Sequence, residues 1–219
     1  MTDPPDPHPD VHPDVHPDVA RLHAARPSRV ADLVGTLADP AVLVLATTLV
    51  VALRSSGSVL AGLGWTLLDV SLCVGAPYGV LALLLRRGVV SDRQVVRRGE
   101  RRVPLLAALG CVLVGLAVLT AAGAPRPVVA LVVSMLGGLA VMTLVSHWYK
   151  ASFHAGVAAG SGVVLVATLG APASVPVAAL VGLVGWARVR AGRHSPGHVA
   201  VGVVVGAVTG VLVFVPLTR

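Results

Sequence analysis

Seven long apolar segments, separated by short polar stretches, constrain the fold of this chain more than any other feature. A membrane-spanning helix needs roughly 20 apolar residues to cross a hydrocarbon core of about 30 Å. Strands of an outer-membrane barrel would alternate polar and apolar residues, whereas these segments are apolar throughout. The segments cover residues 30–53, 59–85, 103–122, 128–145, 155–170, 175–189 and 199–216.

The composition supports helices in a membrane rather than a soluble core. Of the 219 residues, 55% are hydrophobic and 12% are charged, which is more apolar surface than a soluble domain of this size can bury. Aromatic residues make up only 3%, and the abundant Gly, Ala, Val and Leu suit close packing of helices in lipid. We expect an all-α integral membrane protein, a polytopic bundle of six to seven transmembrane helices that contacts membrane lipids and can form a homo-oligomer.

The first part of the chain is predicted to differ from the rest. Residues 4–19 repeat His-Pro-Asp-Val, and proline at this density opposes helix formation and favours an extended, solvated chain. The predicted division is therefore a disordered tail, residues 1–29, followed by a transmembrane domain, residues 30–219. Within that domain, Asp39-Pro40 interrupts the first apolar segment and predicts a kink or a helix entry point.

Few polar side chains lie within the apolar segments. Asp69 falls inside the second segment and should face the bundle interior, because a carboxylate in lipid is costly. Cys73 and Cys111 also lie inside apolar runs, where small buried thiols are common. The two cysteines support neither a disulfide framework nor a cysteine metal site.

The order of the segments places the polar stretches on one side of the membrane. Residues 86–102, 147–154 and 187–194 are separated from one another by two helices, so they share a face with the N-terminal tail. Of the 17 Lys and Arg residues, only Arg54, Arg126 and Arg219 fall on the other face. The positive-inside rule therefore makes the basic face cytoplasmic. We expect a bacterial plasma-membrane protein with a cytoplasmic N-terminus and an external C-terminus.

Acidic residues are absent from the second half of the chain, where His and Arg cluster. Nothing after Glu100 is Asp or Glu, so this half lacks the carboxylates that magnesium sites and paired-carboxylate catalysis use. We expect no metal and no cofactor. The clusters comprise Lys150, Ser152 and His154 before the fifth segment, and Arg188, Arg190, Arg193, His194 and His198 between the sixth and seventh.

These residue types suit phosphoryl transfer. Arginine forks bind phosphate oxygens through two parallel hydrogen bonds, and helix N-termini such as those near His154 and His198 attract anions. One histidine can attack phosphorus while another protonates the leaving oxygen. The simpler interpretation remains open, in which Arg188 reaches to lipid headgroups as an anchor. The basic charge does not predict nucleic-acid binding, because the arginines lie at the ends of apolar segments.

Small residues follow both histidine clusters at helical spacing. Gly156 and Gly160 come just after His154, and Gly202, Gly206 and Gly210 come just after His198. Glycines four residues apart allow helix backbones to touch. If the two glycine stripes face each other, His154 and His194 can meet; generic packing in a glycine-rich protein is the alternative.

The two clusters resemble motifs of the type 2 phosphatidic acid phosphatase superfamily. The sequence HWYKASFHAG resembles the superfamily's second motif, Pro-Ser-Gly-His, and ARVRAGRHSPGHVAVG resembles its third, Ser-Arg-x5-His-x3-Asp. The resemblance covers roughly residues 85–215. It implies that His194 is the nucleophile that becomes phosphohistidine, that His154 is the general acid, and that Arg188 and Ser152 bind phosphate. It also implies metal-independent hydrolysis of lipid phosphates or polyprenyl pyrophosphates.

Three departures from the superfamily pattern bear most directly on catalysis. His198 stands where the third motif has Asp, so it would orient the nucleophile without supplying a negative charge. Phe153 replaces the glycine of the second motif. The first motif, Lys-x6-Arg-Pro, has no literal match; Arg101 is its nearest arginine, and Lys150 is a substitute for its lysine.

Three functions follow as alternatives. The first is a membrane phosphatase that removes phosphate from a lipid or polyprenyl carrier through a phosphohistidine; a hydrolase of exported carriers would need the reverse membrane orientation. The second is a catalytically degenerate membrane protein that binds anionic lipid or a partner helix. The third is a small transporter, although nothing in the apolar segments marks an internal repeat or a coupling-ion site.

Overall fold

The computed structural model describes residues 28–91 and 102–219, and every regular element in these two stretches is a helix. Residues 1–27 of the predicted tail lie outside the described residues, and its last two, Ser28 and Arg29, are the N-cap and the first residue of α2. The longer helices are α2 (Arg29–Leu37), α3 (Pro40–Ser55), α4 (Val59–Val70), α5 (Ala76–Arg86), α6 (Arg102–Ala121), α7 (Arg126–Trp148), α8 (Phe153–Leu169), α9 (Ser174–Arg190) and α10 (Pro196–Thr209). Short elements continue them: η1 (Ser71–Gly75), η3 (Ala171–Ala173), η4 (Gly210–Phe214) and α11 (Val215–Thr218).

Each of the seven predicted apolar segments is helical in the structure. Among the described residues, five helical stretches are long and apolar enough to cross a membrane: 59–86, 102–121, 126–148, 171–190 and 196–218. A sixth arises if α2 and α3 together form one span. The helix α8 has 17 residues, which is at the lower limit for a span. The helical class is confirmed, and a seventh crossing stays a prediction.

The predicted interruption at Asp39-Pro40 is a bend of 41° between α2 and α3. Asp39 caps the N-terminus of α3, where its carboxylate accepts a hydrogen bond of 2.9 Å from the Ala41 amide. Pro40 follows at the first helical position, which tolerates proline because the amide there has no partner within the helix. The first segment is therefore two helices, and α2 is free to lie across other parts of the bundle.

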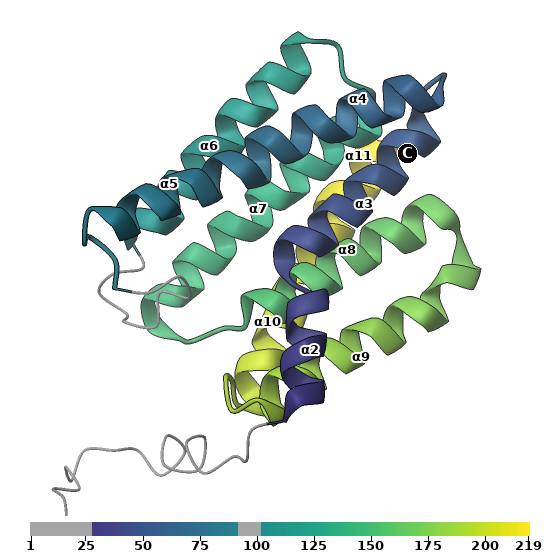
Figure 1. Ribbon diagram of the computed structural model, residues 1–219. Helices are drawn as coiled ribbons and strands as arrows, with labels where there is room; N and C mark the ends of the chain where they lie inside the picture. The colour runs from purple at the N-terminus through teal and green to yellow at the C-terminus, as the bar shows by residue number, and fades with distance from the viewer. Residues whose placement is uncertain (1–27, 92–101) are drawn as a thin grey trace, which may run out of the picture.

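The bundle has two ends with different loops. In Figure 1 the start of α2, the turn from α7 to α8 and the turn from α9 to α10 gather at the lower left. The turns α3–α4, α6–α7 and α8–α9 and the C-terminus lie towards the upper right. The helices thus place the two histidine clusters at one end, as the even number of intervening helices predicts.

The glycine stripes of α8 and α10 do face each other. A methyl group added to Gly156 would lie 3.2 Å from the Gly202 carbonyl oxygen, and one added to Gly160 would lie 3.3 Å from that of Gly206. Backbone meets backbone along this contact, which is the most extensive between any two described helices. The glycines therefore set how closely the two histidine-bearing helices approach.

Asp69 faces the bundle interior, as predicted, and is fully buried. The structure also supplies the partner that the sequence leaves unidentified: the Thr48 hydroxyl donates a hydrogen bond of 2.7 Å to the Asp69 carboxylate. Thr48 belongs to α3 and Asp69 to α4, so the bond joins these two helices. Cys73 is a buried free thiol and Cys111 is a half-buried one.

Candidate functional site

Main-chain hydrogen bonds bring the two histidine clusters together. The Ser152 amide donates to the His198 carbonyl over 2.9 Å, which joins the N-terminus of α8 to the first turn of α10. At the end of α9, the Arg188 carbonyl accepts hydrogen bonds from the amides of Arg193 (3.1 Å) and His194 (3.2 Å). Gly192 makes this tight return possible with a φ of 65°.

Serine caps hold the two helix starts at the site. The Ser152 hydroxyl accepts from the Ala155 amide over 3.4 Å and begins α8. Ser195 begins α10 in a reciprocal cap, in which its hydroxyl accepts from the His198 amide and its own amide donates to His198 Nδ1 over 3.2 Å. Ordinary helix capping explains these serines locally, and the caps fix where both helices begin.

His194 lies in a half-buried, positively charged environment. Burial lowers the pKa of His194 to about 3, and the charges of Arg188, Lys150, His198 and His154 act in the same direction. A neutral imidazole is the nucleophilic form. At neutral pH the structure thus holds His194 in the state that attack on phosphorus requires, among cations that suit an anion.

Two nitrogen atoms at the site are buried without a hydrogen-bond partner. Among the described residues, only four buried side-chain polar atoms lack one, and Arg188 Nε and His194 Nδ1 are two of them. Buried polar groups normally have hydrogen-bond partners. The unpaired nitrogens of Arg188 and His194 therefore leave hydrogen-bonding capacity in this region that the protein itself does not use. Both residues are among those that the sequence assigns to phosphate chemistry.

Arg188 packs against the short helix α2. A methyl group added to Gly35 would lie 3.6 Å from a terminal nitrogen of the Arg188 guanidinium. Asp32 and Asp39, at the start and just past the end of α2, act electrostatically on Arg188. The N-terminal helix therefore forms one wall of the site, with two carboxylates near the arginine.

Asp39 is a site residue that the sequence interpretation missed. One oxygen of its carboxylate lies 3.9 Å from His154 Nε2. The other accepts a hydrogen bond of 3.1 Å from the Tyr78 hydroxyl of α5. The Asp-Pro pair is a recognisable helix start, and treating it as the start of the first span would have placed Asp39 on the same membrane face as His154. That signal was available, although no pattern links Asp39 to His154 across more than 100 positions.

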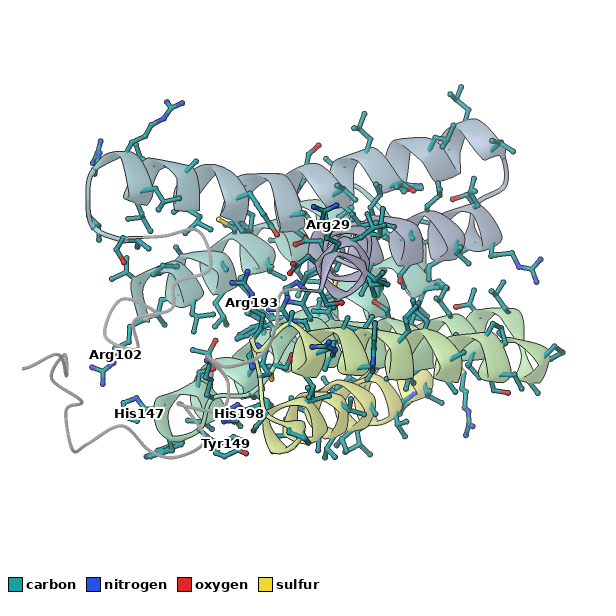
Figure 2. All side chains as sticks on the ribbon, turned by 60° about the horizontal axis from the view of Figure 1, so that its bottom comes forward. Arg29, Arg102, His147, Tyr149, Arg193 and His198 are labelled. Carbon is teal, nitrogen blue, oxygen red and sulfur yellow. The ribbon has the colours of Figure 1, made fainter. Side chains whose placement is uncertain are left out.

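His198 is tied to its neighbours rather than to His194 Nδ1. Its Nδ1 accepts from the Ser195 amide, and its ring meets that of His194 edge-on at 5.9 Å between centroids. The Tyr149 ring lies 5.1 Å from the His198 ring, and Figure 2 shows these two side chains next to each other. His198 thus packs beside His194; the structure shows no hydrogen bond from it to His194 Nδ1.

The remaining predicted ligands are placed as follows. Ser152 is fully buried, and its hydroxyl is the α8 cap. Lys150 is half-buried, and its charge acts on His194. Arg101 lies outside the described residues. Among the residues that the structure does describe, no group of three His, Cys, Asp or Glu side chains is arranged to hold a metal ion.

Comparison of the chain with protein-family models, with curated proteins and with solved structures finds no match. The assignment of a function therefore depends on the residues and on the geometry described above.

Proposed function

We propose that this protein is a membrane-embedded phosphatase. It would hydrolyse a phosphate monoester or pyrophosphate of a lipid or polyprenyl carrier without metal, as the motif resemblance implies. One observation carries the proposal: Arg188 in the last turn of α9, His194 in the loop after it and His154 in the first turn of α8 act on one another electrostatically, and Arg188 Nε and His194 Nδ1 are buried without partners.

The reaction divides between two histidines. Because Nδ1 of His194 is buried, Nε2 is assigned the attack on phosphorus, which forms a phosphorus–nitrogen bond while the bond from phosphorus to the alcohol oxygen breaks. His154 donates its proton to the departing oxygen, which leaves as the alcohol. Water then attacks the phosphohistidine and loses a proton to His154, and the phosphorus–nitrogen bond breaks to release phosphate and neutral His194.

The cations around the histidines stabilise the phosphoryl group. The Arg188 guanidinium matches two phosphate oxygens, and Lys150 adds a positive charge close to His194. Burial and the charge of Arg188 lower the pKa of His154 to about 4, and Asp39, 3.9 Å from His154 Nε2, partly opposes that shift and so supports the protonated form that donates to the leaving group.

Phosphate release tests the proposal directly. The purified protein is assayed with lipid phosphates in chelator, as wild type, as His194→Ala and as Arg54→Ala, an arginine remote in sequence from both clusters. We expect loss of turnover in His194→Ala and wild-type rates in Arg54→Ala. Equal rates in wild type and His194→Ala would refute the assignment of the nucleophile.

A non-catalytic anion-binding protein is the second candidate, and one observation favours it. His194 Nδ1 has no hydrogen-bond partner, and the residue at the position of the orienting carboxylate, His198, uses its Nδ1 in the α10 cap. Without an acceptor the imidazole is poorly prepared to carry positive charge. Binding of an alkyl phosphate that is lost in Arg188→Ala, together with no phosphate release from wild type, would identify this function.

A further inference from the structure

The bundle contains a partly open apolar cavity of about 250 Å³. It lies between α3, η1, α5, α6, α7, α8 and α10, and its walls are mostly aliphatic side chains and glycines. An apolar cavity of about 150 Å³ is already large enough to bind benzene. A larger apolar space within a membrane protein is therefore able to hold a hydrocarbon chain.

The cavity begins beside the candidate site. Phe153, which lines it, directly precedes His154, and Pro40, which also lines it, directly follows Asp39. Tyr78 lines it as well, and the Tyr78 hydroxyl donates to the Asp39 carboxylate. Phe153, Pro40 and Tyr78 are thus joined by covalent or hydrogen bonds to His154 or to Asp39. The side chains of His154 and Asp39 lie 3.9 Å apart at the site.

From the site the cavity runs into the bundle along α8. Its lining on that helix extends from Phe153 to Val164, a distance of about 16 Å at 1.5 Å of rise per residue. A carbon–carbon bond of about 1.5 Å advances an extended chain by somewhat less than its length, so this distance matches on the order of a dozen carbons. Small residues of the wall, such as Gly156, Gly160 and Ala108, take up little of this space.

We propose that this cavity binds the hydrocarbon chain of a substrate whose phosphate lies at Arg188 and His194. The substrate class is a phosphate monoester or pyrophosphate with a single apolar chain, of which about a dozen carbons are enclosed. Such a substrate places its phosphate among the cations of the site and its hydrocarbon chain in the apolar cavity along α8. The inference rests on the proposed function for the position of the head, but binding of the chain does not require hydrolysis.

Photolabelling tests the position of the chain without turnover. The probe is a dodecyl phosphonate, which cannot be hydrolysed, with a diazirine at its last carbon. We expect labelled peptides that contain the deep wall residues Leu131 and Val164, and loss of that labelling in Arg188→Ala. Labelling confined to lipid-facing positions such as Leu113, or unchanged in Arg188→Ala, would overturn the proposal.

A pair of matched substitutions on α6 tests chain selection. Ala108 lines the cavity, whereas Ala117 is exposed on the outside of the same helix. Ala108→Phe should lower kcat/KM for dodecyl phosphate relative to butyl phosphate by at least about tenfold, and Ala117→Phe should leave this ratio unchanged. An unchanged ratio in both variants of an active protein overturns the cavity assignment and leaves the phosphatase intact. Phosphonate labelling of the deep wall in a protein without activity supports the cavity and overturns the phosphatase.

Discussion

The contact between α8 and α10 predicts a large and specific effect for Gly206→Ala. A methyl group at Gly206 would overlap the carbonyl group of Gly156 and approach the Gly160 amide nitrogen to 3.0 Å. Both groups belong to the backbone of α8, so no side-chain rotation can relieve the overlap. The two helices must separate, and the hydrogen bond between the Ser152 amide and the His198 carbonyl at the site must lengthen.

The size of the effect follows from overpacking and from the lost helix contact. Adding a methyl group to a tightly packed interior costs about 1–3 kcal/mol, and contact with an immobile backbone points to the upper end. Gly110 provides the matched control, because a methyl group there meets nothing within 4 Å. Gly110→Ala should instead stabilise α6 by up to about 1 kcal/mol through its helix propensity. The two variants should differ by about 3–4 kcal/mol.

The assay is unfolding in mixed detergent–SDS micelles, followed by circular dichroism, for wild type and both variants. Gly206→Ala should unfold at lower SDS and bind alkyl phosphate more weakly, whereas Gly110→Ala should match or exceed wild type in both. Equal stability of the two variants would refute the close approach of α8 and α10. Loss of stability with unchanged phosphate binding would show that this contact does not position the site.

Three further predictions concern the site and its orientation. Burial lowers the pKa of His194 to about 3 from an ordinary 6.5, so between these pH values the unfolded chain binds a proton that the folded chain does not. The free energy of unfolding should therefore fall as the pH drops from 6.5 towards 3. Urea titrations at several pH values should show that it changes less with pH in His194→Gln. Asp39→Asn should slow release of poor leaving groups such as alkyl alcohols more than p-nitrophenol, because the carboxylate supports proton donation by His154; equal slowing of both would assign Asp39 a structural role only. A C-terminal reporter that is active only in the cytoplasm should be silent if seven helices cross the membrane from a cytoplasmic N-terminus, and its activity would contradict that topology.

Local patterns were sufficient to predict the helices and much of their packing. Apolar runs of this length can satisfy their backbone hydrogen bonds in lipid only as helices, which made the helical class predictable. Asp39-Pro40 marked a helix boundary because its capping chemistry is local. The glycine stripes indicated a close contact because their spacing matches the helix repeat, and the structure confirms that Gly156 faces Gly202 and that Gly160 faces Gly206.

Contacts between distant segments required the tertiary structure. The bend after α2 decides that this helix packs on Arg188 and that Asp39 reaches His154, and no periodicity encodes either contact. The pairing of Asp69 with Thr48, and the cavity beside Phe153, likewise depend on how several helices pack. A sequence specifies the apolar faces and the helix ends through local hydrogen bonding and hydropathy. Which faces meet is decided by the packing of the whole bundle, since each contact depends on the shape of every neighbouring helix.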